Sequence, residues 1–133
     1  MLDQRLEHDE RRALLACRVA PRPGEAAAVI GFPEDGPLDI EPARTGTTQR
    51  VVSSDAYDRG PVERIVTSFR VYVRPGNSGG PAVNANGRVV STIFASRSDS
   101  DESGYGVPSR IVRRYLQNAA GRTTPVSTGG CAN

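Results

Sequence analysis

The stretch RPGNSGGPAVNANGRVVS, residues 74–91, constrains the fold of this chain more than any other segment. Its four glycines allow backbone conformations that other residues avoid, and Pro81 interrupts any continuing helix. The residues that follow predict a strand (81–84), a turn containing Asn-Gly (85–87) and a second strand (88–96). A glycine-rich turn that leads into a β-hairpin favours a sheet protein, and it disfavours a helix directly after the serine.

Apolar residues in the rest of the chain recur with the period of strands. The further strands expected from this pattern are 25–32, 38–54, 62–73 and 105–109. Pro42 is expected at a sheet edge or at a bulge. The inward side chains expected in 62–73 are Val62, Ile65, Phe69, Val71 and Val73. Their phase slips near Thr67, which predicts a β-bulge there. Loops are expected at 55–61 and 97–104.

One helix is expected, at 109–119, with Ser109 as its N-cap and an apolar face made by Ile111, Val112, Tyr115 and Leu116. Six strands followed by one helix, in a chain with 14 glycines and 10 prolines, predict an all-β fold. The expected architecture is a six-stranded antiparallel barrel with a C-terminal α-helix. Residues 1–16 are expected as a charged helical segment, 17–120 as the barrel with its helix, and 121–133 as a tail.

Charge and hydropathy exclude several classes of function. The formal net charge is +2, and the arginines are scattered and balanced by 15 acidic residues. Because no basic stripe with interleaved aromatics is present, we expect no nucleic-acid partner. No apolar run reaches the length of a membrane span, and the charged opening MLDQRLEHDERRALLAC does not read as a secretory signal.

Ser78 lies in GNSGG, which fits the pattern G-x-S-x-G. In α/β-hydrolases such a serine sits between a strand and a helix, and the hairpin that follows here argues against that context. In a β-barrel protease, the N–H groups of the serine and of the residue two positions earlier hold the developing oxyanion, and here that residue is Gly76. The third interpretation is a glycine turn without chemistry.

A family resemblance extends well beyond the serine. RPGNSGGPAVNANGRVVSTIFAS, then an acidic loop, then GYGVPSRIVRRYL closely resembles the second barrel of trypsin-like bacterial serine proteases of the HtrA type. That match spans about residues 60–116. GEAAAVIGFPEDGPLDIEPARTG and the closing PVSTGGCAN resemble membrane-anchored proteases of the MarP type, which extends the likeness to residues 14–133.

The resemblance implies roles for particular residues. Ser78 becomes the catalytic nucleophile, and the backbone N–H groups of Gly76 and Ser78 form the oxyanion hole. The expected substrate-binding residues are Tyr72, Ile93, Phe94, Ala95, Ser96, Gly104, Tyr105 and Gly106. Tyr72 takes the position that carries a carboxylate in trypsin, so we expect an uncharged, small or medium apolar P1 residue in the peptide or protein substrate. No metal or organic cofactor is implied.

The mechanism also needs a histidine base and an aspartate that orients it. The single histidine, His8, lies in LEHDERR, which does not resemble the family's histidine motif, and we expect it at the surface. In the family both residues come from the first barrel, and Asp9, Asp35 and Asp55 have no distinguishing feature. The expected function is therefore the C-terminal half of a serine endopeptidase, inactive without a first barrel. The chain is expected to be part of a two-barrel protease; pairing with a separate first-barrel chain and a non-catalytic peptide-binding module remain alternatives.

The resemblance also bears on location and on the two cysteines. It implies an extracytoplasmic site, periplasmic or in the cell envelope, where disulfides persist. A Cys17–Cys131 disulfide would close a loop on the order of a hundred residues, worth about 4.7 kcal/mol in the chain-entropy model. The alternative, which we favour because the tail ties the two barrels together in relatives, is that Cys131 pairs with a cysteine of the first barrel.

Overall fold

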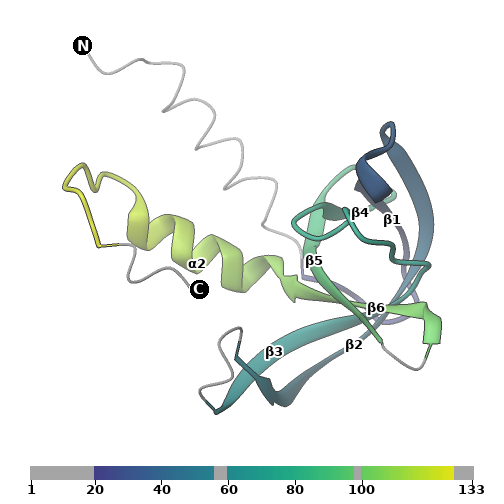
Figure 1. Ribbon diagram of the computed structural model, residues 1–133, viewed down its shortest axis with the longest axis horizontal. Coiled ribbons are helices and arrows are strands. Elements are labelled where there is room, and N and C mark those ends of the chain that lie inside the picture. Colours follow the sequence, from purple (N-terminus) through teal and green to yellow (C-terminus); the bar gives the residue numbers. More distant parts are fainter. Residues whose placement is uncertain (1–19, 56–59, 98–99, 128–133) are drawn as a thin grey trace.

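Six antiparallel strands close into one barrel, and a helix leaves it at the C-terminal end (Figure 1). The computed structural model describes residues 20–55, 60–97 and 100–127. The elements are β1 (Ala26–Gly31), the short helix η1 (Pro33–Asp35), β2 (Asp39–Ser54), β3 (Pro61–Arg70), β4 (Pro81–Asn84), β5 (Val89–Arg97), β6 (Ser100–Pro108) and α2 (Ser109–Ala119). Around the barrel the strands follow the order β1-β2-β3-β6-β5-β4. This confirms the expected all-β fold with a C-terminal helix.

The barrel is filled by apolar side chains from β1, β3, β4 and β5 and from the residue that follows β3, of which Phe69 is the largest. The buried cluster consists of Val29, Phe69, Val71, Ala82, Val90 and Ile93. Phe69 and Val71 are inward as predicted, and the half-buried Val73 packs against the cluster. Earlier in β3, the inward position lies one residue from the expected one. Val66 is buried there, whereas Ile65, the residue expected to point inward, is only half-buried.

The predicted bulge exists, but the extra residue belongs to the neighbouring strand. Thr45 pairs with Phe69 and Thr48 pairs with Thr67, so two residues of β2 face one residue of β3. Gly46 lies in this bulge, where a Cβ would collide with the Ser68 side chain. The bulge expected near Thr67 is therefore present at this level of the sheet, with its extra residue in β2.

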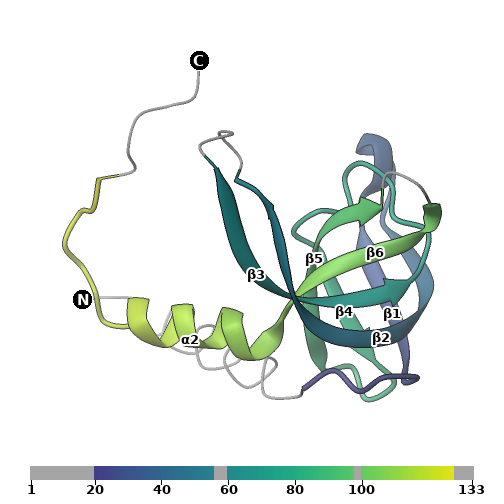
Figure 2. The same cartoon turned by 90° about the horizontal axis from the view of Figure 1, so that it is seen from below.

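Strand β2 changes partners along its length. Its first residues pair with β1, and pairing with β3 starts at Arg44. Pro42 lies before Arg44, where β2 is not yet paired with β3. On that side Pro42 is at a sheet edge, as predicted, and no ladder hydrogen bond needs an N–H from it. The outer halves of β2 and β3 stand away from the barrel as a hairpin (Figure 2), and Val52 on it is largely exposed.

The region after β5 differs from the prediction in two ways. The expected acidic loop at 97–104 is mostly strand, because β6 already begins at Ser100 and pairs with both β3 and β5. Ser109 is the first residue of α2 and not its N-cap; it is buried, and its hydroxyl donates to the Val89 carbonyl at 2.7 Å. Pro108 takes the cap position.

Helix α2 extends from the end of β6 away from the barrel (Figures 1 and 2). Tyr115 and Leu116, half of its predicted apolar face, are exposed. Residues 121–127 contain no regular helix or strand. The predictions for residues 1–16, Cys17 and Cys131 lie outside the described residues, so the proposed division at residues 17 and 121 remains a prediction. Among the described residues no helix combines the length and the apolar character needed to cross a membrane.

Candidate active site

The serine lies in the loop that joins β3 to β4, and two successive tight turns shape this loop. The Asn77 N–H donates to the Arg74 carbonyl at 3.1 Å, and the Gly80 N–H donates to the Asn77 carbonyl at 3.0 Å. Gly76 (φ +96°) and Gly79 (φ +87°) flank the serine in backbone conformations that favour glycine. The glycines that suggested a turn in the sequence are therefore the residues that make it.

The loop is tied to strand β5 on the C-terminal side of the serine. The Gly79 N–H donates to the Ile93 carbonyl at 2.7 Å, and the Ile93 N–H donates to the Gly80 carbonyl at 2.9 Å. Gly80 also packs so closely on strand β1 that a Cβ would collide with the Ile30 carbonyl oxygen. The backbone that carries the nucleophile candidate is thereby held by two strands.

The N–H groups on either side of Asn77, those of Gly76 and Ser78, lack an acceptor within the described chain. Asn77, Gly79 and Gly80 each donate a backbone hydrogen bond, whereas within the described chain no acceptor faces the N–H of Gly76 or of Ser78. Ser78 itself is exposed, and its hydroxyl makes one long contact of 3.4 Å to the Phe94 carbonyl. An exposed hydroxyl and two unpaired N–H donors within three residues are suited to attack a carbonyl and to hold the charge that develops on its oxygen.

The predicted pocket residues of β5 and β6 lie side by side. Ile93 pairs with Gly106, Ala95 with Tyr105, and Ser96 with Gly104. Ile93 is fully buried, whereas Phe94 is 39% exposed. The structure thus brings together seven of the eight residues that the sequence suggested for substrate binding.

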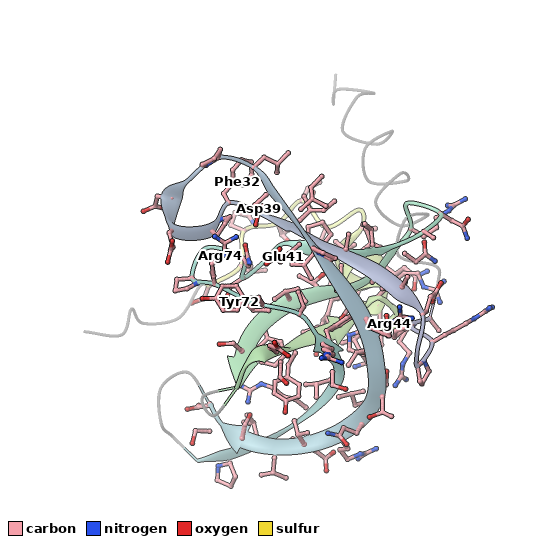
Figure 3. All side chains as sticks on the ribbon, turned by 90° about the vertical axis from the view of Figure 1, so that its right-hand side faces the viewer. Phe32, Asp39, Glu41, Arg44, Tyr72 and Arg74 are labelled. Atoms are coloured by element: carbon pink, nitrogen blue, oxygen red, sulfur yellow. The ribbon has the colours of Figure 1, made fainter. Side chains whose placement is uncertain are left out.

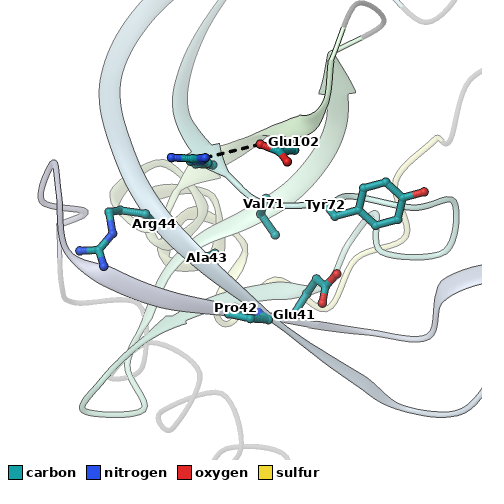
Figure 4. Close-up of a pocket in the computed structure, with 8 residues that line it drawn as sticks. Glu41, Pro42, Ala43, Arg44, Val71, Tyr72 and Glu102 are labelled. Carbon is teal, nitrogen blue, oxygen red and sulfur yellow. Dashed lines mark ion pairs between the residues drawn. The ribbon is translucent and has the colours of Figure 1, made fainter.

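Tyr72 is the exception. Its ring is 47% exposed and lines a surface cavity of about 440 Å³ together with residues 41–44, Arg70, Val71 and Glu102 (Figure 4). The side chain that approaches Gly104 is Val73, with Val71 behind it. The alternation of residues 71–73 predicts the same arrangement: if Val71 and Val73 point inward, Tyr72 between them points to the surface. Ser78 lines neither this cavity nor a second one of about 470 Å³ beside it.

No hydrogen bond links the acidic residues Asp35 and Asp55 to the Ser78 hydroxyl, whose contact among the described residues is the Phe94 carbonyl. Asp35 lies in η1, and Asp55 follows the outer end of β2. His8 and Asp9 lie outside the described residues. Over residues 20–55, 60–97 and 100–127, no three His, Cys, Asp or Glu side chains lie close enough together to hold a metal ion.

Sequence comparisons identify serine proteases as relatives of this chain. The trypsin-like peptidase domain family matches residues 8–91, more than half of the chain. The serine protease Rv3671c of Mycobacterium tuberculosis is 35% identical over 111 residues, which are 83% of this chain and 28% of that protein. The chloroplastic protease Do-like 2 of Arabidopsis thaliana is 31% identical over 98 residues, 72% of this chain and 16% of that protein.

Solved structures agree with the sequence relatives. The active form of the Rv3671c protease superposes with a TM-score of 0.77 at 32% identity, over 87% of this chain and 51% of that one. Its inactive form gives 0.68 at 31% identity, over 77% of this chain and 52% of that one. The HtrA-type protease AlgW, at 21% identity and a TM-score of 0.62, shares the fold; it is covered to 33%, and 76% of this chain is matched. The chain therefore spans about half of the solved Rv3671c protease and about a quarter of the full relative, and it belongs to the family of trypsin-like peptidase domains.

Proposed function

We propose that this chain is the nucleophile-bearing half of a serine endopeptidase. The observation that carries the proposal is the exposed Ser78 hydroxyl, flanked by two N–H groups that lack an acceptor within the described chain. In the acylation step the Ser78 oxygen bonds to the carbonyl carbon of a peptide, and the carbonyl electron pair moves to its oxygen. The N–H groups of Gly76 and Ser78 stabilise that oxyanion, and its collapse expels the amine with the proton that the serine gave up.

The proton needs a base that this part of the chain does not supply. A serine hydroxyl is a weak nucleophile near neutral pH until an adjacent base accepts its proton. We assign that base, and the aspartate that orients it, to a first barrel outside this sequence. The support is that the chain covers 28% of the Rv3671c protease, and that His8 lies in a sequence context unlike the family's histidine motif.

Exposed apolar side chains beside the serine loop support the same conclusion. Phe32, Leu38 and Ile40 lie on or next to the turn between β1 and β2, and each is between 56% and 61% exposed. This turn contacts the serine loop through a hydrogen bond from the Glu34 N–H to the Pro75 carbonyl. Large apolar side chains gathered next to a reactive residue are typical of a surface that another domain covers. We assign this surface to the first barrel and place the assembled enzyme outside the cytoplasm.

Labelling with a fluorophosphonate probe tests the proposal. The 133-residue chain alone should react slowly, and the chain joined to its histidine-bearing barrel should react rapidly. Ser78→Ala should abolish labelling in both forms. Rapid, Ser78-dependent labelling of the chain alone would place the base inside it, and His8→Gln would then show whether His8 is that base. Peptide binding without labelling in either form would identify the non-catalytic peptide-binding module instead.

A further inference from the structure

We infer that the turn between β1 and β2, residues 32–39, is the element that positions the Gly76 N–H for oxyanion binding, with Asp39 and Arg74 as its positioning residues. This inference rests on the proposed function, and it concerns how one of the two oxyanion donors is held. Three consecutive residues of the serine loop, Arg74, Pro75 and Gly76, each contact this turn.

The central contact acts on the same peptide unit that carries the donor. The Glu34 N–H donates to the Pro75 carbonyl at 2.7 Å. That carbonyl and the Gly76 N–H are opposite ends of one planar trans peptide, so fixing the oxygen also fixes the direction of the N–H. If this peptide rotated by half a turn, the hydrogen bond from Glu34 would break and the Gly76 N–H would reverse its direction.

The turn is held in an unusual backbone conformation while it makes this bond. Glu34 (φ +56°) and Asp35 (φ +57°) both occupy the left-handed region, which residues with a Cβ seldom adopt. Such strain persists only where surrounding contacts determine it, and it gathers at functional sites. Here it places the Glu34 N–H against Pro75.

Arg74 connects the turn to the serine loop by both its side chain and its main chain. Its guanidinium forms a half-buried ion pair with Asp39 and lies 5.8 Å from the centre of the Tyr72 ring (Figure 3). Its carbonyl accepts the Asn77 N–H, which closes the tight turn around Gly76. A displacement of the Arg74 side chain would therefore be transmitted to the Gly76 peptide through one short stretch of backbone.

The two ends of the loop are anchored separately. On the oxyanion side, Gly76 packs so tightly on the turn that a Cβ would overlap the Phe32 carbonyl oxygen. On the nucleophile side, Gly79 and Gly80 are tied to Ile93 of β5. Releasing the Asp39–Arg74 pair should loosen the first anchor and leave the second intact. The structure therefore predicts loss of oxyanion stabilisation without displacement of Ser78.

Kinetics of the assembled two-barrel enzyme test this inference through Asp39→Asn and Arg74→Gln. Removing a whole oxyanion donor typically costs about 10²–10³ in kcat, so a misaligned donor should cost about tenfold, with KM nearly unchanged. Affinity for a peptide boronate, whose tetrahedral adduct places an oxygen in the oxyanion hole, should fall by the same factor. Asp39→Glu should restore much of the loss. The matched control is Glu63→Gln, which breaks the exposed Arg50–Glu63 pair on the β2–β3 hairpin and should change neither quantity.

Nuclear magnetic resonance of the 133-residue chain gives a readout that does not depend on activity. In Asp39→Asn and Arg74→Gln the Gly76 amide should shift and become more mobile, while the Gly79 amide, bonded to Ile93, should not change. An unchanged Gly76 amide would overturn the inference, and so would equal disturbance of Gly76 and Gly79 with kcat and KM altered together. If the wild-type two-barrel enzyme were inactive, that result would count against the proposed function alone. The amide spectra would still decide whether the β1–β2 turn positions the Gly76 N–H.

Discussion

Gly76 and Gly79 offer a matched pair of substitutions that measures how tightly the serine loop packs on the β1–β2 turn. Both residues have positive φ, so alanine at either position incurs the left-handed penalty of about 1–2 kcal/mol. They differ in their surroundings. A Cβ at Gly79 meets nothing within 4 Å, whereas a Cβ at Gly76 would overlap the Phe32 carbonyl and lie 3.0 Å from the Glu34 nitrogen.

The expected destabilisation follows from this difference. Gly79→Ala should lower the free energy of unfolding by about 1–2 kcal/mol. Gly76→Ala should lower it by about 1–3 kcal/mol more, because overpacking against backbone atoms forces the turn to move. Urea denaturation of the chain followed by circular dichroism measures both values under identical conditions, with an unchanged slope as the sign that the denatured state is comparable. Equal losses for the two variants would refute the close packing from which the positioning of Gly76 was argued.

Three further predictions concern other parts of the chain. The assembled enzyme should cleave after small or medium apolar P1 residues, because Val73 rather than a carboxylate approaches Gly104; a peptide-library profile dominated by Arg or Lys would contradict this. Ser109→Ala should lower the free energy of unfolding by about 1–3 kcal/mol, measured by urea titration, since the Val89 carbonyl loses its buried donor; an unchanged midpoint would show that water replaces it. Cys131 should pair with a cysteine of the first barrel, so reduction of this chain alone should leave its mass unchanged; a gain of about two hydrogens would establish the Cys17–Cys131 bond, whose closed loop is worth about 4.7 kcal/mol in the chain-entropy model.

The fold could be predicted because strand period and turn residues agree over most of the barrel. Phe69 and Val71 alternate inward as expected, and the glycine run before β4 forms the expected turn. The start of β6 could not be predicted in the same way. Its first residues are polar, and they join the barrel through backbone pairing with β3 and β5, which leaves no apolar signal in the sequence.

The bulge shows a second limit of sequence reasoning. A phase slip in one strand reports that two strands change register, but it does not say which strand carries the extra residue. Here the insertion lies at Gly46 and Thr47 of β2, opposite Ser68. Pairing information is needed to decide, because the sequence of one strand does not show how many residues its neighbour places opposite it.

Some features of the candidate site depend on residues that are close in the sequence, and others on residues that are far apart. The turn around Ser78 and the paired segments of β5 and β6 could be predicted from a continuous motif, since each depends on residues close together in the chain. The Asp39–Arg74 pair could not, because the two residues are 35 positions apart and neither belongs to a recognisable pattern. The spacing from the serine predicts Tyr72 in the pocket; in the structure Tyr72 is 47% exposed, and the side chain nearest to Gly104 is that of Val73.

These contacts separate what the described chain provides from what it needs. The Ser78 backbone is held by β5 through Gly79 and Gly80, and the Gly76 peptide is held by the β1–β2 turn through Glu34. Both anchors lie within this barrel, so the loop conformation that the proposed oxyanion donors need does not depend on contacts with a second domain. Within the described residues, the Ser78 hydroxyl has one hydrogen-bond contact, to the Phe94 backbone carbonyl, and a backbone carbonyl is not a general base. The proposed function therefore takes the proton acceptor from a first barrel. On this proposal, joining a first barrel would supply the base to a serine loop whose backbone is already held.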